Sequence, residues 1–203
     1  MSIGPYVRHQ SDKRHYIGLM SADNEVKGIY KCYKLLFSKS EIEVVSGLGN
    51  YFQDILHDAE YVSNYIVSHI NKKIRQNVDR YIFKDSVAIH VRLGDYNDQQ
   101  RIPLSWYVEK IKQKKNDGFE NFLLFSDGTD EELRLLTDIK GVKRVFFGNA
   151  IADIYAMSKC SYIIGSDSTF SGWAAFLGQV PCCFQRKHFG PVLHDKSNEI
   201  VEN

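Results

Sequence analysis

The chain has 203 residues, of which 43% are hydrophobic and 25% are charged, and its formal net charge is +1. This composition is typical of a globular protein with one good core, and the small net charge gives no reason to expect nucleic acid as a partner. No apolar run approaches the roughly 20 residues needed to span a bilayer, and the amino terminus lacks the charged-then-apolar layout of a secretory signal.

Residues 1–84 differ in pattern from the rest of the chain. About the first forty residues are polar and mixed, with no clear period. Between Phe52 and Asn77, apolar side chains then recur at helical spacing, which predicts one long helix that buries one face. We therefore expect a short, mostly helical segment before the main domain.

From residue 85 onward, predicted strands alternate with single predicted helices. The predicted strands are Val87–Val91, Asn121–Phe125, Arg144–Phe147, Ser161–Ile164 and Val180–Phe184. The predicted helices are Pro103–Lys115, a helix opened by the capping box Thr129–Glu132, Ala150–Lys159 and Thr169–Leu177. Single helices between strands imply right-handed βαβ units, so we expect an α/β fold with a Rossmann-like parallel sheet over residues 85–190 and a tail at 191–203.

Polar residues gather directly after the predicted strands. These residues are Arg92 and Asp95, Asp127, Asn149, and the run from Ser166 to Ser171. Ligands of open parallel sheets bind beyond the carboxyl ends of the strands. We therefore expect Arg92, Asp127, Asn149 and Ser168 to share one rim of the sheet.

The segment Val87-Ala-Ile-His-Val-Arg-Leu-Gly-Asp-Tyr96 ends a buried strand with an arginine. A guanidinium in that place suits an anionic ligand, because its planar fork binds phosphate or carboxylate oxygens in pairs. We expect Arg92 to project from the rim. Taken alone, the segment favours an arginine that is paired with a nearby carboxylate beside an ordinary turn, and the rest of the chain reverses this preference.

The turn Gly165-Ser-Asp-Ser-Thr169 leads into a predicted helix. Backbone N–H groups and hydroxyls at the positive end of a helix dipole form a phosphate site. The alternative is that the polar residues of this turn only compete to be the N-cap. Gly172, inside the helix, indicates a close approach of another backbone or of a ligand.

The motifs that the chain lacks narrow the chemistry further. It has no Asp-x-Asp, no P-loop and no His/Cys metal spacing, and its four cysteines form no C-x-x-C pair. We therefore expect a bound diphosphate to be neutralised by Arg92 and a helix amino terminus, without a metal. The cysteine pattern fits a reduced, cytoplasmic setting.

Two segments of the chain and the elements between them resemble a known family, the α-1,2-fucosyltransferases. The run His90-Val-Arg-Leu-Gly-Asp-Tyr96 is similar to their His-x-Arg-x-Gly-Asp-Tyr signature, and Asp153–Leu177 is similar to their second long signature. Leu123–Asp127 and Pro103–Tyr107 match the elements between the two. The resemblance covers about 100 residues in the right order, so it is more specific than any single motif.

The resemblance implies a metal-independent hexosyltransferase of the GT-B type. It would use no cofactor and would transfer L-fucose from GDP-fucose, with inversion, to a sugar hydroxyl, with an α-1,2 linkage to galactose expected. Asp95 and Asp98 are the nearest candidates for the base that deprotonates the acceptor, and either one can instead be structural. The expected partners are GDP-fucose and a glycan acceptor, which the enzyme would reach as a cytoplasmic protein, peripheral to a membrane carrying that acceptor.

The resemblance also assigns roles to single residues. The catalytic residues are Arg92, Asp95 and His90. The donor-binding residues are Arg92, Asp127, Asn149, Asp167, Ser168, Thr169 and Phe170. Arg92 would bind the diphosphate, Ser168–Phe170 would cradle the phosphates, and Asp127 would sit near the nucleoside. His90 and Asp95 would hold the Arg92 loop in shape or approach the sugar.

The chain also departs from the family pattern. Asp167 stands where the family usually has Asn, and Gly172 where it commonly has an aromatic residue. Residues 47–53 resemble an element at the end of the family's acceptor domain, so we expect residues 1–84 to be the tail of an acceptor-side domain. These departures favour an alternative function, that of a truncated nucleotide-sugar-binding remnant without transferase activity.

Overall fold

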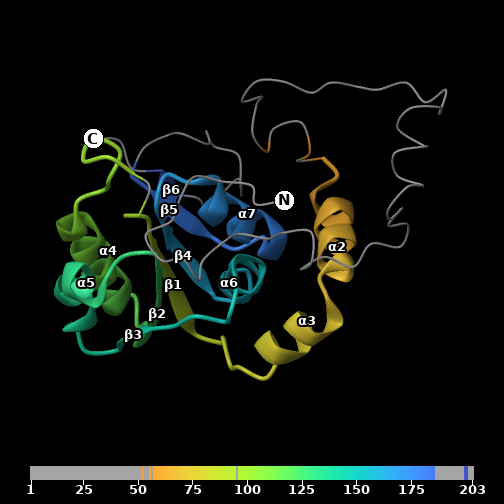
Figure 1. Cartoon of the computed structure of the whole chain (residues 1–203), viewed down its shortest axis with the longest axis horizontal. Coiled ribbons are helices and arrows are strands. Elements are labelled where there is room, and N and C mark those ends of the chain that lie inside the picture. The colour runs from red at the N-terminus through yellow and green to blue at the C-terminus, as the bar shows by residue number, and fades with distance from the viewer. Residues whose placement is uncertain (1–51, 53–54, 56, 95, 186–198, 201–203) are drawn as a thin grey trace, which may run out of the picture.

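The computed structural model describes residues 52, 55, 57–94, 96–185 and 199–200. The strands in this part are β1 (Ser86–Val91), β2 (Asn121–Ser126), β3 (Val142–Arg144), β4 (Tyr162–Gly165), β5 (Cys182–Phe184) and β6 (Glu199–Ile200). They form one six-stranded parallel sheet in the order β3-β2-β1-β4-β5-β6 (Figure 1). The predicted α/β fold with a Rossmann-like parallel sheet is confirmed.

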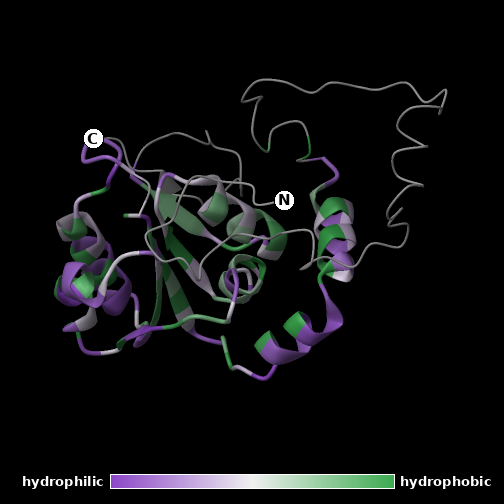
Figure 2. Ribbon diagram, in the orientation of Figure 1, coloured by the Kyte–Doolittle hydropathy of each residue, from purple (hydrophilic) through white to green (hydrophobic). Residues whose placement is uncertain are grey.

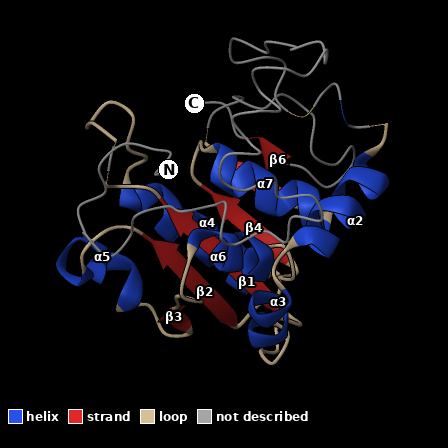
Figure 3. Ribbon diagram, turned by 45° about the vertical axis from the view of Figure 1, so that its right-hand side comes forward, coloured by secondary structure: helices blue, strands red, loops and turns tan. Residues whose placement is uncertain are grey.

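Helices cover both faces of the sheet (Figure 3). They are α2 (Ala59–His69), α3 (Lys72–Val78), α4 (Leu104–Asn116), α5 (Asp130–Thr137), α6 (Ala150–Met157) and α7 (Thr169–Gly178). α4 and α5 pack on one face, and α6 and α7 pack on the other. α2 and α3 lie outside this second layer, against α7 and α6 respectively.

The two faces of β1 belong to different hydrophobic clusters. Val87, Ile89 and Val91 contact the cluster under α4 and α5, whereas Ala88 belongs to the cluster under α6 and α7. Figure 2 shows the apolar strands inside and the polar residues on the outer helical surfaces. Because side chains alternate along a strand, this pattern directs His90 toward the α6 and α7 layer.

The helix predicted from Phe52 to Asn77 is interrupted. α2 ends at His69, and Ile70 is extended, with ψ 134°, and almost fully buried. Asn71 then opens α3, because its side chain accepts a hydrogen bond from the Lys73 N–H at 2.9 Å. The apolar spacing predicted the buried face correctly, but an asparagine that caps a new helix breaks the old one.

The third strand lies earlier than predicted, at Val142–Arg144 instead of Arg144–Phe147. The Phe147 N–H donates to the Asp153 carboxylate at 2.8 Å, so this amide takes no part in the strand ladder. The Phe147 ring packs against Tyr81 and Phe83. A sixth strand, Glu199–Ile200, pairs with β5 within the segment predicted as a tail.

The capping box of α5 is confirmed and gives a first prediction. Thr129 Oγ1 accepts the Glu132 N–H at 3.2 Å, and the Glu132 carboxylate accepts the Thr129 N–H at 2.8 Å. Thr129→Ala removes one acceptor from the helix start, so we expect the free energy of unfolding in urea to fall by about 1 kcal/mol.

Thr137→Ala, at the other end of α5, is the matched control. Its hydroxyl donates only to the exposed Arg134 carbonyl, so the change should stay within about 0.5 kcal/mol. Equal losses in the two variants would contradict a specific role for the cap.

Candidate functional site

The candidate site lies where the sheet changes its direction of winding. β1 and β4 are neighbours, but the chain continues from β1 toward β2 and from β4 toward β5. A crevice forms at the carboxyl ends of two such strands, and ligands of open α/β sheets bind there. Arg92 follows β1 and Ser166 follows β4, and the Ser166 N–H donates to the His90 carbonyl at 3.0 Å.

His90 joins the end of β1 to the start of α7. Its Nδ1 lies 2.6 Å from Ser171 Oγ and 3.0 Å from Ser166 Oγ. Its ring stacks on the Phe170 ring, with 4.8 Å between the centroids. Since the imidazole is buried, these contacts fix the first turn of α7 beside the strand.

Gly165 allows this close approach. A Cβ at this position would come within 2.9 Å of Ser171 Cβ and 2.5 Å of the Phe184 ring. Any larger residue would push α7 away from β4 or displace the Phe184 side chain. The start of α7 therefore depends on a glycine at the end of the preceding strand.

Arg92 forms a buried ion pair with Asp127, across β1 and β2. The Arg92 Nε lies 3.4 Å from Asp127 Oδ2, and the two side chains are 7% and 8% exposed. Asp127 Oδ1 also accepts the Leu93 N–H at 2.8 Å. Arg92 therefore does not project freely from the rim as expected, because a carboxylate from the next strand holds it down.

The loop after β1 is fixed by a second arginine. Arg101 donates to the Leu93 carbonyl at 2.7 Å and to the Tyr96 carbonyl at 3.0 Å. The Tyr96 ring lies 5.8 Å from the Arg92 guanidinium carbon. At Gly94 a Cβ would lie 2.7 Å from Asp127 Oδ2, so the turn requires glycine to pass this carboxylate.

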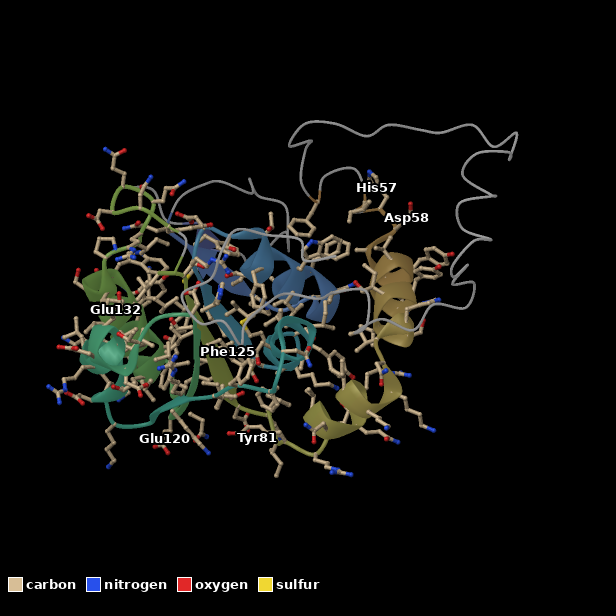
Figure 4. The ribbon with its side chains drawn as sticks, in the orientation of Figure 1. His57, Asp58, Tyr81, Glu120, Phe125 and Glu132 are labelled. Atoms are coloured by element: carbon tan, nitrogen blue, oxygen red, sulfur yellow. The ribbon has the colours of Figure 1, made fainter. Side chains whose placement is uncertain are left out.

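A cleft opens between the ends of β1 and β2 and the start of α6. It is lined by His90, Arg92, Phe125, Ser126, Asp127, Phe146, Ala150, Asp153 and Phe170. Four residues singled out from the sequence, His90, Arg92, Asp127 and Phe170, thus meet in one place. Figure 4 shows Phe125 in the interior of the molecule, between the sheet and α6.

Other candidate residues surround this cleft or lie elsewhere. Ser168 is buried and caps α7, accepting the Phe170 N–H at 3.2 Å, and exposed Thr169 begins the helix. The N-cap alternative for this turn is therefore correct for Ser168. Asn149 caps α6 and lines a different hollow, with residues of α3, so it does not share the cleft. Asp95 lies outside the described residues.

Asp167 lies in the turn between β4 and α7 and does not line the cleft. Its carbonyl accepts the Tyr96 hydroxyl at 3.1 Å. Burial raises the pKa of the Tyr107 hydroxyl, in α4, well above its ordinary value, and the negative charge of the Asp167 carboxylate raises this pKa further.

Phe146 and Asp153 line the cleft and were missed as site residues. Phe146 is 68% exposed, which is unusual because phenylalanine side chains are mostly buried. Both residues belong to the connection and helix that follow β3. Because ligands bind after strands, residues that follow β3 are expected in the site. The third strand was predicted to end at Phe147 instead of Arg144, so Asn149 was predicted as the site residue in place of Phe146.

The arrangement suits a ligand with negative charge and a flat ring. Arg92 supplies a guanidinium, and the start of α7 supplies backbone N–H groups near the positive end of the helix dipole. Phe146 supplies an exposed aromatic surface at the mouth of the cleft. Within the described residues no three His, Cys, Asp or Glu side chains gather to hold a metal ion, and no helix there is long and apolar enough to cross a membrane.

One family model and several solved structures are similar to this chain. The model of glycosyl transferase family 11 matches residues 40–181. No curated protein matches the sequence. Similar solved structures include the E. coli ADP-heptose LPS heptosyltransferase II, at 16% identity and a TM-score of 0.48 over 66% of this chain and 44% of that chain.

Two fucosyltransferase structures are also similar. The NodZ α-1,6-fucosyltransferase from Bradyrhizobium, soaked with GDP-fucose, is 18% identical, with a TM-score of 0.43 over 60% of this chain and 47% of that chain. POFUT1 in complex with GDP-fucose is 14% identical, with a TM-score of 0.44 over 69% of this chain and 48% of that chain. The chain spans less than half the length of each of these three proteins.

The buried ion pair of the site gives the second prediction. Asp127→Ala leaves the Arg92 guanidinium buried without this carboxylate and removes the acceptor of the Leu93 N–H. Breaking a buried pair on one side typically costs about 3–5 kcal/mol, so we expect a loss of that size in the free energy of unfolding in urea.

Asp130→Ala is the control, because this carboxylate is 92% exposed and pairs with Arg144 at the surface. Its loss should cost no more than about 1 kcal/mol. If Asp127→Ala were no more destabilising than Asp130→Ala, the pair would not hold Arg92 in place.

Proposed function

Because the chain belongs to glycosyl transferase family 11, whose model matches residues 40–181, we propose that it transfers L-fucose from GDP-fucose to a sugar hydroxyl. The observation that carries this proposal is the cleft in which the two signature segments meet. His90 and Arg92 of the first signature lie there with Phe170 and Asp153 of the second. A site assembled from both signatures supports a common role for them.

In this proposal Arg92 and the start of α7 bind the diphosphate of the donor. A guanidinium makes strong, charge-assisted hydrogen bonds to phosphate oxygens. The Asp127 carboxylate orients Arg92 and offsets its charge, so the helix dipole of α7 would supply much of the remaining attraction. Ser168 and Thr169 lie at this helix start and would contact the phosphates once the donor is bound.

The remainder of the cleft suits a guanine base. Guanine presents N–H donors at its ring edge, which a carboxylate accepts well. Asp153 lines the cleft, and the exposed Phe146 ring would stack on the base. Guanine suits this lining because its N1–H and its N2 amino group are adjacent and can both donate to one carboxylate.

The chemistry follows from where charge develops. As the bond from fucose to GDP breaks, the anomeric carbon becomes oxocarbenium-like and negative charge grows on the diphosphate. Arg92 and the α7 amides would stabilise that charge most strongly in the transition state, and this difference accelerates the reaction. Inversion at the anomeric carbon, independence of metal and an α-1,2 linkage to galactose are parts of the same proposal.

The acceptor base remains to be assigned. Asp98 is fully exposed, and its carboxylate lies 3.8 Å from Arg101, a residue that fixes the loop after β1. These contacts favour a structural role for Asp98. Asp95, three residues after Arg92 in the sequence, is therefore our candidate for the base.

The second candidate function is nucleotide-sugar binding without transfer. The departure at Asp167 favours it, because this carboxylate adds negative charge to the turn that would receive phosphates. Calorimetry with GDP, followed by transfer of labelled fucose to galactoside acceptors, separates the two functions. Binding with transfer supports the transferase, and binding without transfer supports the alternative.

Arg92→Lys gives the third prediction. Lysine keeps a positive charge near Asp127 but loses the planar fork, so it meets one phosphate oxygen where arginine meets two. We expect affinity for GDP, measured by calorimetry in the presence of EDTA, to fall roughly tenfold to hundredfold.

Arg134→Lys, on the exposed surface of α5, is the matched control and should bind GDP as the wild type does. Full GDP affinity in Arg92→Lys would exclude the role given to Arg92. Loss of all GDP binding on addition of EDTA to the wild-type protein would refute the metal-independent part of the proposal.

A further inference from the structure

The segment Arg80–Lys84, just before β1, presents an apolar side chain between two cations. Arg80, Ile82 and Lys84 are exposed, and Ile82 reaches 83%, the highest value among the exposed large hydrophobic residues. Tyr81 and Phe83 alternate with them and point inward, where both rings pack against Phe147. The outward direction of Ile82 is therefore fixed by its neighbours.

Hydrogen bonds at both ends hold this segment. The Tyr81 N–H donates to the Val78 carbonyl at 2.9 Å, and the Ser86 N–H donates to the Phe83 carbonyl at 3.1 Å. Because both ends are anchored, Ile82 has no route into the core. The Ile82 side chain is therefore left accessible to a partner, and its burial there would remove apolar surface from water.

Four cations surround Ile82 and its turn. Two hollows share Arg80, one lined also by Lys73 and the other also by Lys84 and Lys143, and neither lining contains a carboxylate. Among the described residues none of these four side chains forms an ion pair. Residues 71–85 hold five basic and two acidic side chains, in a chain whose net charge is only +1.

The acidic neighbours of this surface are few. Asp79 is occupied by Lys159, at 2.9 Å, and by the Tyr155 hydroxyl, at 3.1 Å. Asp85 and Glu120 are exposed. Figure 4 shows Glu120 along the same lower edge of the molecule as Tyr81, so this edge also carries a carboxylate.

The part of this basic surface that contains Lys84 and Lys143 lies at the opposite edge of the sheet from the cleft, whereas the hollow with Lys73 reaches Asn149, the N-cap of α6. The hollow beside Lys84 is lined by Ser86 and Asn121, the first residues of β1 and β2, whereas Arg92 and Asp127 follow the ends of the same strands. A partner bound here would leave the cleft open to dissolved nucleotide.

We propose that Arg80, Ile82, Lys84, Lys73 and Lys143 form a docking surface for a bilayer that contains anionic phospholipid. A single apolar side chain ringed by cations matches such a surface, because Ile82 would enter the boundary between headgroups and acyl chains while the cations meet lipid phosphates. The inference is independent of fucosyl transfer, because it uses no residue of the cleft.

Co-sedimentation of the full chain with vesicles tests this proposal. Vesicles of phosphatidylcholine alone are compared with vesicles in which a third of the lipid is phosphatidylserine. We expect binding only to the second kind, and we expect its loss in about 1 M salt, where charges are screened within about 3 Å.

Two variants and two controls sharpen the test. Ile82→Ser should weaken the partition onto anionic vesicles roughly tenfold, and Lys84→Ser roughly fivefold. The controls are Leu135→Ser, which removes an exposed apolar side chain from α5, and Lys112→Ser, which removes an exposed cation from α4. Both should bind anionic vesicles as the wild type does. Thermal melting and GDP calorimetry on each variant verify that the fold and the cleft are intact.

Two results would overturn the proposal. One is that the wild-type protein stays in solution with anionic vesicles. The other is that Ile82→Ser binds anionic vesicles as well as Leu135→Ser does, while immobilised heparin retains every variant with an intact Lys84. The surface would then be a general site for polyanions, without insertion of an apolar side chain.

Discussion

The hydrogen bonds of His90 connect β1 to the turn and helix that follow β4, where the strand order of the sheet reverses, and the candidate site depends on them. Its Nδ1 contacts Ser166, in the turn after β4, and Ser171, in the first turn of α7, while Phe170 stacks on its ring. Arg92 lies two residues farther along the same chain. The spacing between the guanidinium and the start of α7 is thus set through one buried imidazole, whose rotamer is constrained by two hydroxyls.

The charge of the site is organised around a neutral pair. Arg92 is buried against Asp127, so its charge is largely compensated before any ligand arrives. A buried guanidinium without that carboxylate would be costly, whereas a pair can be desolvated in advance and held in a fixed orientation. Such a site would select its ligand by geometry, because a diphosphate must accept hydrogen bonds from the Arg92 guanidinium and from the α7 backbone amides at the same time.

The sequence predicted the parallel sheet, and it singled out four residues that meet in the cleft, His90, Arg92, Asp127 and Phe170, because these features follow from short apolar runs and from residues at strand ends. It predicted the Thr129 cap for the same local reason. It did not predict the helix break at Asn71, where a side chain competes with the backbone, or the depth of Arg92. The position of Asn149 and the part played by Phe146 depend on where the chain turns after β3, which the Asp153 side chain decides. Such hydrogen bonds between a side chain and the backbone leave no periodic pattern in the sequence.

The central claim is that a guanine nucleotide binds at the carboxyl edge of the sheet, between Arg92 and the start of α7. A structure of the full chain with GDP tests it most directly. We expect diphosphate oxygens within hydrogen-bonding distance of the Arg92 guanidinium and of backbone N–H groups at the start of α7, with the base beside Phe146 and Asp153. GDP bound at the opposite edge, among Arg80, Lys84 and Lys143, or with its phosphates away from Arg92, would contradict it.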